Sequence, residues 1–223
     1  TVCSGEQYTF IGGGRNHIVD GDCSTIAGGA YNCITANAAT IVGGTKNTGS
    51  GACGFIGGGC GNTVTDELSV IGGGKANCVT SGSSVIGGGC SNFVSGQRSF
   101  IGSGTNNDIC NTCGAFIGGG CTNVISGSAA SSNHVIAGGS NNEIVVHDAN
   151  QSFSAVATIG GGYNNCITHG GSVIAGGTNH TVSGYQGVIV GGDTNTVSGC
   201  YSSITGGRLS CVSGCCSAVV NGC

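Results

Sequence analysis

Cysteines are the residues of this sequence best able to do chemistry. The chain has 16 cysteines among 223 residues, a density typical of extracellular proteins from an oxidising compartment. A zinc site would need two Cys-x2-Cys pairs or nearby histidines, and only Cys110 and Cys113 have that spacing. We therefore expect disulfides rather than a metal site, and no metal or other cofactor.

One segment is dense in titratable side chains. Glu143, His147 and Asp148 lie within residues 142–150. The sequence contains no Gly-x-Ser-x-Gly elbow, HExxH motif or P-loop lysine beside them, so we expect a solvated surface excursion and not an enzyme. Asn150 and Asn179 each begin an Asn-x-Ser/Thr sequon, and whether either is glycosylated is left open by the sequence.

The composition excludes several classes of protein. Only 6% of the residues are charged, the net charge is -4, and the five Lys and Arg form no block, so we expect no nucleic-acid partner. No run of about 18 apolar residues exists, which predicts no membrane insertion. The 49 glycines occur without any proline, which excludes collagen. A compact protein built from turn-rich repeats remains.

An internal repeat runs through the whole chain. Its frame positions are spaced by 15 residues, except for spacings of 16, 19 and 23 between residues 101 and 159. We predict fourteen rungs of a single domain over residues 1–223, with longer loop insertions within 117–159. The frame positions are Ile11, Ile26, Ile41, Ile56, Ile71, Ile86, Ile101, Ile117, Ile136, Ile159, Ile174, Ile189, Ile204 and Val219.

Each rung contains two short strands. The first ends at the frame isoleucine, and the second is centred eight residues later on Val or Ile, with Gly49 as the one gap. β-Branched residues bounded by Gly, Ser and Asn are typical of strands, and the recurring glycine triplets exclude helices. The fold class is therefore all-β, a single parallel β-solenoid or β-roll.

Two columns of polar or small residues accompany the strands. Glycine occupies the third place after every frame position, which indicates positive φ or close backbone packing. Three places further on lies a predicted asparagine ladder, in which each amide bonds the next rung. His17, His180 and Ser210 complete it. Its asparagines are Asn32, Asn47, Asn62, Asn77, Asn92, Asn107, Asn123, Asn142, Asn165 and Asn195.

The residue before each frame isoleucine should point outward, because side chains alternate along a strand. This column predicts an apolar outer stripe, and exposed stripes of that kind mark interfaces. In the alternative arrangement the stripe forms the core and the isoleucines face outward. The stripe includes Phe10, Phe55, Val70, Val85, Phe100 and Phe116.

The same columns restrict disulfide pairing. Cys200 and Cys215 occupy one position in successive rungs, about 4.8 Å apart, which fits a disulfide. Cys110 and Cys113 share one turn and form a second candidate pair. Cys3 and Cys223 have no obvious partner, and we expect them at a junction between subunits.

Two stretches carry a resemblance to known repeats. Residues 84–96, SVIGGGCSNFVSG, are similar to head repeats of trimeric autotransporter adhesins and to fibre repeats of marine phages and giant viruses. Residues 178–184, TNHTVSG, resemble more weakly the repeats of grass-type ice-binding β-rolls. The adhesin heads imply a left-handed roll and trimeric packing along an apolar face.

These observations favour a structural role. If Thr1 followed Cys223 of another copy, the next frame spacing would be 223 − 219 + 11 = 15, which predicts end-to-end stacking of copies. We expect the chain to be a subunit of an extracellular or virion-surface filament, and its partners to be further copies of itself. Fourteen rungs would span roughly 65 Å. Ice binding and a trimeric adhesin or fibre tip are the alternatives, the latter with recognition on residues 117–159.

Overall fold

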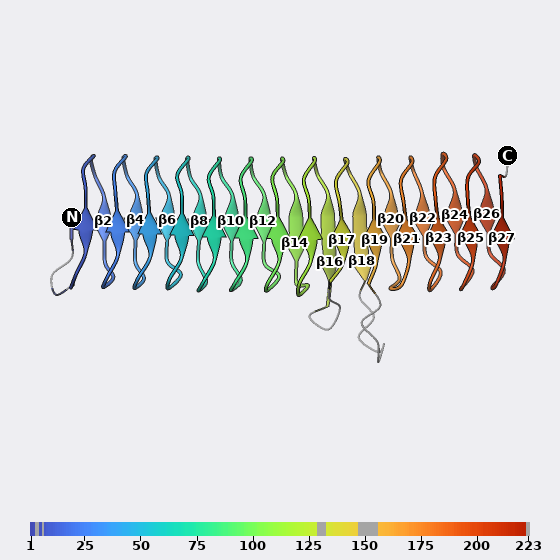
Figure 1. Cartoon of the computed structure of the whole chain (residues 1–223), viewed down its shortest axis with the longest axis horizontal. Coiled ribbons are helices and arrows are strands. Elements are labelled where there is room, and N and C mark those ends of the chain that lie inside the picture. The colour runs from blue at the N-terminus through green and yellow to red at the C-terminus, as the bar shows by residue number, and fades with distance from the viewer. Residues whose placement is uncertain (3–4, 6, 129–132, 147–155, 222–223) are drawn as a thin grey trace. The chain divides into compact units, whose positions relative to one another are not determined.

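The computed structural model is an all-β parallel solenoid, as predicted. It describes residues 1, 2, 5, 7–128, 133–146 and 156–221. Within these residues the chain forms about 13 turns of about 15 residues in two parallel sheets, without any helix (Figure 1). Fourteen frame positions give about 13 turns because the last one begins a turn that the described residues do not complete. The handedness stays a prediction.

The chain forms two compact units, Thr1–Asn106 and Asn107–Cys223, here called unit 1 and unit 2. In both units the odd-numbered strands form one sheet and the even-numbered strands the other. Neighbouring strands pair in parallel, so that Val70 lies opposite Val85 and Thr63 opposite Cys78. That residues 1–223 make a single domain stays a prediction.

Unit 1 consists of two-residue strands. A glycine-rich segment follows each odd strand of this unit and ends it after two residues. Its odd strands are β1 (Phe10–Ile11), β3 (Thr25–Ile26), β5 (Thr40–Ile41), β7 (Phe55–Ile56), β9 (Val70–Ile71), β11 (Val85–Ile86) and β13 (Phe100–Ile101). Its even strands are β2 (Ile18–Val19), β4 (Cys33–Ile34), β6 (Thr48–Gly49), β8 (Thr63–Val64), β10 (Cys78–Val79) and β12 (Phe93–Val94).

Unit 2 has the same strand order but longer even strands where the repeat spacing changes. Two of them, β16 and β18, reach four residues. Its odd strands are β15 (Phe116–Ile117), β17 (Val135–Ile136), β19 (Thr158–Ile159), β21 (Val173–Ile174), β23 (Val188–Ile189), β25 (Ser203–Ile204) and β27 (Ala218–Val219). Its even strands are β14 (Asp108–Cys110), β16 (Val124–Gly127), β18 (Glu143–Val146), β20 (Cys166–Ile167), β22 (Thr181–Val182), β24 (Thr196–Val197) and β26 (Cys211–Val212).

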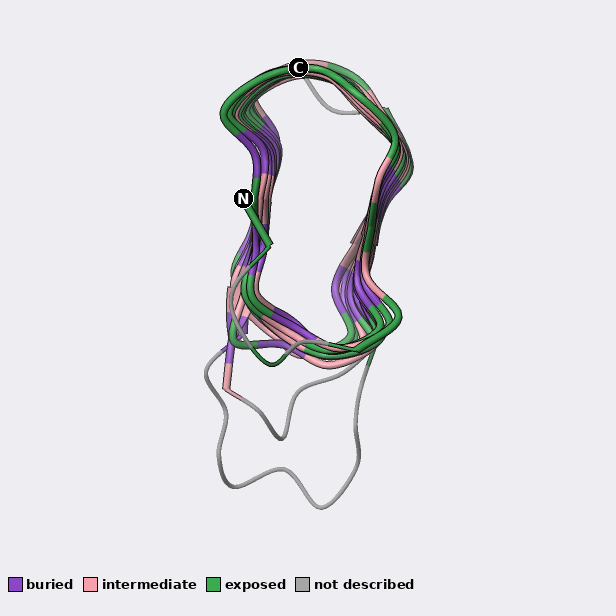
Figure 2. Cartoon of the chain, turned by 90° about the vertical axis from the view of Figure 1, so that its left-hand side faces the viewer, coloured by how far each residue is buried: buried purple, intermediate pink, exposed green. Residues whose placement is uncertain are grey.

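The frame isoleucines and the valine or isoleucine column of the even strands form the core. Ile26 and Val64 are representative, each with no exposed surface. Figure 2 shows the buried segments along the two facing sides of the turn. The alternative in which the isoleucines face outward is therefore wrong, because alternation along each two-residue strand turns the preceding residue to solvent.

The outer stripe lies on the odd sheet. Phe55 and Phe100 of unit 1 and Phe116 of unit 2 keep 37%, 38% and 39% of their surface exposed, and Phe10 keeps 57%. Val70 and Val85 of unit 1 are half-buried. The structure thus leaves apolar side chains at the surface of each unit. None of the described residues belongs to a helix long and apolar enough to cross a membrane.

Candidate functional site

The predicted asparagine ladder is present as side-chain hydrogen bonds between turns. Asn77 is typical: its backbone N–H donates to Asn62 Oδ1 at 3.0 Å, and its Nδ2 donates to the carbonyls of Gly73 and Gly89, each at 3.0 Å. Through its backbone N–H and its side-chain amide together, Asn77 therefore joins three successive turns. The ladder asparagines have no exposed surface, so they hold the stack together and are not available to a ligand. They are Asn32, Asn47, Asn62, Asn77 and Asn92 in unit 1 and Asn107, Asn123, Asn142, Asn165 and Asn195 in unit 2.

Histidine replaces asparagine in two turns of this ladder. Nδ1 of His180 accepts a hydrogen bond from the Asn195 backbone N–H at 3.1 Å, and His17 accepts one from Asn32 at 3.2 Å. The buried Nε2 of each ring has no hydrogen-bond partner among the described residues. Burial lowers the pKa of His180, and the Gly192 carbonyl and Asp193 carboxylate only partly oppose this. Each ring thus replaces the acceptor of the asparagine amide but not its hydrogen-bond donors. Ser210 takes the last place, its backbone N–H donating to Asn195 Oδ1 at 2.9 Å.

A second ladder, built from serine, was not predicted from the sequence. Ser84 Oγ donates to the Gly96 carbonyl at 2.9 Å and accepts from the Ser99 backbone N–H at 3.2 Å. The available signal was a serine two places before the frame isoleucine. It was hidden because other residues, among them Ala39, Gly54 and His134, interrupt the column. The serines of this column are Ser24, Ser69, Ser84, Ser99, Ser172, Ser202 and Ser217.

The described cysteines carry no disulfide in the structure. Cys200 and Cys215 do lie in adjacent turns, since the Cys216 backbone N–H donates to the Cys200 carbonyl at 2.9 Å, but they are not bonded to each other. Cys110 is not bonded to Cys113 either; its Sγ donates to Asp108 Oδ1 at 3.1 Å. These pairings stay predictions for oxidised material. The proposed junction residues, Cys3 and Cys223, lie outside the described residues.

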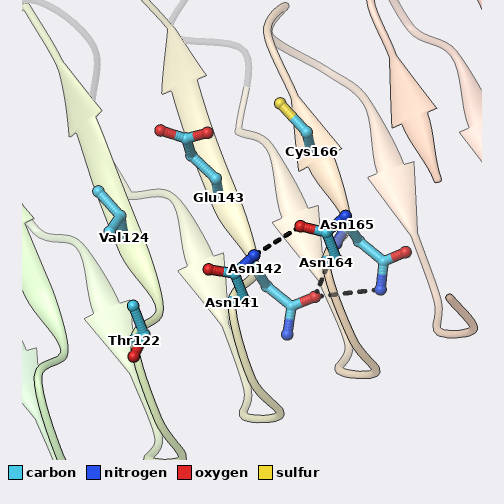
Figure 3. A pocket seen from close by; sticks show the side chains of 8 residues that line it. All are labelled: Thr122, Val124, Asn141, Asn142, Glu143, Asn164, Asn165 and Cys166. Atoms are coloured by element: carbon cyan, nitrogen blue, oxygen red, sulfur yellow. Dashed lines mark hydrogen bonds between the residues drawn. The ribbon is translucent and has the colours of Figure 1, made fainter. Parts of the chain in front are cut away.

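A polar hollow of about 160 Å³ opens on the even sheet of unit 2, over the turns of β16, β18 and β20. Figure 3 shows Glu143 and Cys166 toward one end of it and the asparagines toward the other. Val124, Glu143 and Cys166 are register partners on the three strands. The lining residues are Thr122, Val124, Asn141, Asn142, Glu143, Asn164, Asn165 and Cys166.

Exposed amides form a short surface ladder at the asparagine end of this hollow. Asn141 Nδ2 donates to Asn164 Oδ1 at 2.5 Å, and Asn164 Nδ2 donates to Asn179 Oδ1 at 2.8 Å. At the other end the Glu143 carboxylate is exposed and makes no hydrogen bond to the described residues. Burial and, to a smaller degree, the charge of Glu143 raise the pKa of Cys166, so the thiol stays protonated beside the carboxylate at neutral pH.

A second hollow, of about 240 Å³, lies in unit 1 and contains Asp66, Glu67 and Arg98. No group of three His, Cys, Asp or Glu side chains in the described part of the chain is placed to bind a metal ion. Of the titratable segment singled out in the sequence, the structure places Glu143 in the unit 2 hollow. His147 and Asp148 lie outside the described residues, as does the Asn150 sequon.

The outer face of the even sheet carries rows of hydroxyl and thiol groups. In unit 1 the outward residues of four successive strands are Cys33, Thr48, Thr63 and Cys78, in parallel register. Unit 2 repeats the same order with Cys166, Thr181, Thr196 and Cys211. Two places beyond these lies a second row: Thr35, Ser50, Thr65 and Thr80 in unit 1, and Thr168, Ser183, Ser198 and Ser213 in unit 2.

No protein-family model matches this chain. A search of curated proteins finds no match either.

Proposed function

We propose that this chain is a structural segment of an extracellular or virion-surface fibre and not an enzyme. The observation that carries the proposal is the asparagine ladder. In each turn that holds a ladder asparagine, the buried side-chain amide is used in hydrogen bonds to its own turn and the next, as at Asn77. The repeating polar groups of the interior therefore stabilise the stack and are not free to act on a substrate.

Further copies could extend such a stack with the bonds already used inside it. Turns are joined by backbone pairs repeated every 15 residues, for example Val70 N–H to the Ser84 carbonyl and Val85 N–H to the Ser99 carbonyl, each at 2.9 Å. A copy that presents the same edge would satisfy the same donors and acceptors. The exposed phenylalanines of the odd sheet supply apolar area for lateral packing of copies.

Electron microscopy of native, unreduced material beside a reduced aliquot tests this proposal. We expect filaments with an axial repeat of roughly 65 Å, from about 4.8 Å per rung. Thinning or breakage of the filaments on reduction would assign the cysteines to junctions between copies. Dispersed single particles in both samples would overturn the filament proposal.

Ice binding is a second candidate, and the hydroxyl rows of the even sheet favour it. Thr48 and Thr63 are register partners, and parallel strands space such residues about 4.8 Å apart, which makes a regular array. Thermal hysteresis in ice is the measurement. If the array binds ice, Thr63→Tyr should abolish most of the hysteresis, and Thr105→Tyr, at an exposed position outside the strands of both sheets, should preserve it. Absence of hysteresis in the native protein would exclude this candidate.

A further inference from the structure

The hollow of unit 2 is polar, partly preorganised and contains one carboxylate. Its floor is formed by Asn142 and Asn165, which are buried and already committed to the ladder. Its exposed groups are the Glu143 carboxylate, the hydroxyl of Thr122, and the amides of Asn141 and Asn164. The hollow therefore presents polar groups to solvent, among which the Glu143 carboxylate makes no hydrogen bond to the described residues.

These groups fit a neutral ligand that carries several hydroxyls. A carboxylate only accepts hydrogen bonds, an amide both donates and accepts, and a sugar hydroxyl can match either. No Lys, Arg or His lines the hollow, which disfavours phosphate or sulfate ligands. Calcium needs six to eight oxygen ligands, often from several carboxylates, and Glu143 is the one carboxylate lining it.

Size and rigidity limit the ligand further. Pockets for drug-sized molecules measure about 300–1,000 Å³, so a hollow of about 160 Å³ accommodates one ring and leaves the rest of a chain in solvent. Asn164 is held on both sides, by Asn141 at 2.5 Å and Asn179 at 2.8 Å. Fixed amides lose little conformational entropy on binding. The half-buried Val124 supplies a small apolar surface for the C–H face of a ring.

We propose that this hollow binds a single neutral sugar ring, with the Glu143 carboxylate accepting bonds from two ring hydroxyls. Asn141 and Asn164 supply the bonds at the other end. The proposal is independent of the fibre proposal, since the ligand site lies on the outer face of one sheet within unit 2.

Saturation-transfer NMR tests this on the full chain. The probes are the methyl glycosides of glucose, galactose, mannose and N-acetylglucosamine, each at millimolar concentration. We expect transfer to at least one of them. Because hydrogen bonds to a charged group contribute about 1.5–3 kcal/mol, Glu143→Gln should weaken that binding about tenfold or more. Glu67→Gln, which changes another exposed glutamate, in unit 1, should leave it unchanged.

A second readout follows from Cys166, which lines the same hollow. The binding glycoside should slow alkylation of Cys166 by iodoacetamide and leave the rate at the exposed Cys60 unchanged. Absence of transfer to all four glycosides overturns the proposal, and so does transfer that Glu143→Gln does not reduce. Transfer that requires added Ca²⁺ also overturns it, because the carboxylate would then be acting as a metal ligand. Microscopy of Glu143→Gln tests the fibre proposal alone, because filaments should form whether or not the sugar binds.

Discussion

The repeating turn has two places where a buried polar side chain can bond the next turn: the asparagine ladder position, here called the asparagine corner, and the serine ladder position, here called the serine corner. The two corners differ in how many hydrogen bonds the side chain makes. At the asparagine corner, Asn92 Nδ2 donates to Asn77 Oδ1 and to the carbonyls of Gly88 and Gly104, at 3.1, 3.0 and 2.9 Å. At the serine corner, Ser172 Oγ donates to the Gly184 carbonyl at 3.0 Å and accepts from the Gly187 backbone N–H at 3.1 Å. The amide reaches more partners than the hydroxyl can.

That difference explains which corner tolerates substitution. A hydroxyl has one donor, whereas an amide has two donors and an acceptor with two lone pairs. The serine column accordingly accepts Ala39, Gly54 and Ala157, all without a polar side chain. The asparagine column admits only His17, His180 and Ser210. The more bonds a side chain satisfies inside the stack, the fewer residue types can replace it.

The largest expected effect is at the glycine that closes the asparagine corner. Gly74 has φ of +95°, and a Cβ there would overlap the Gly89 carbonyl oxygen. Gly74→Ala should lower the free energy of unfolding by more than about 3 kcal/mol, measured by urea denaturation. Gly73→Ala is the matched control, because a Cβ at Gly73 meets no atom within 4 Å. Equal effects of the two substitutions would contradict this role of the corner.

Loss of one ladder amide should come next. Asn77→Ala leaves the Gly73 and Gly89 carbonyls and the Asn92 backbone N–H without their side-chain partner. The Gly89 carbonyl still accepts from the Lys75 backbone N–H, so two groups are left unsatisfied. At about 1–3 kcal/mol for each, we expect a loss of about 2–4 kcal/mol in the free energy of unfolding. Asn37→Ala, at an exposed asparagine outside the ladder, should cost much less in the same denaturation assay.

The serine corner should be more forgiving. Ser84→Ala removes one donor to the Gly96 carbonyl and one acceptor for the Ser99 backbone N–H. We expect a loss of about 1–2 kcal/mol, because alanine already occupies this column elsewhere. The comparison of the two corners fails if denaturation shows Ser84→Ala to be as damaging as Asn77→Ala.

The smallest effect should be dependent on pH. Burial lowers the pKa of His180 at the asparagine corner and of His134 at the serine corner. Each folded pKa lies below the ordinary value of about 6.5, so the stability contributed by the neutral ring is complete above pH 6.5. It is lost as the pH falls from there through the lowered folded pKa.

Two substitutions separate these histidines. His180→Asn should raise stability slightly at pH 7.5 by restoring the amide, and should remove part of the loss between pH 7.5 and pH 5. His134→Ser should remove another part. The measurement is urea denaturation at both pH values. A loss on acidification that is unchanged in the double variant would assign the effect to other groups.

The fold and the asparagine ladder could be predicted because both recur at a fixed spacing. The fourteen frame positions and the almost unbroken asparagine column fix which residues lie next to one another in successive turns. The serine ladder escaped because Ala39, Gly54 and His134 interrupt it. The pairing of Glu143 with Cys166 follows from the neighbouring ladder positions Asn142 and Asn165. The hollow itself could not be predicted, because its shape depends on side-chain conformations that repeat spacing does not give.

The residue immediately before each ladder position has a consequence for how such a chain can diversify. It adopts the left-handed conformation whatever its side chain, with φ of 57° at Tyr31, 58° at Lys46 and 54° at Ala76. The ladder beside it holds the turn in place against the cost of that conformation. The ladder position, which is nearly always asparagine, thus directly follows a position whose residue type varies from turn to turn. Surface chemistry can be rewritten one turn at a time, while the scaffold that displays it stays the same.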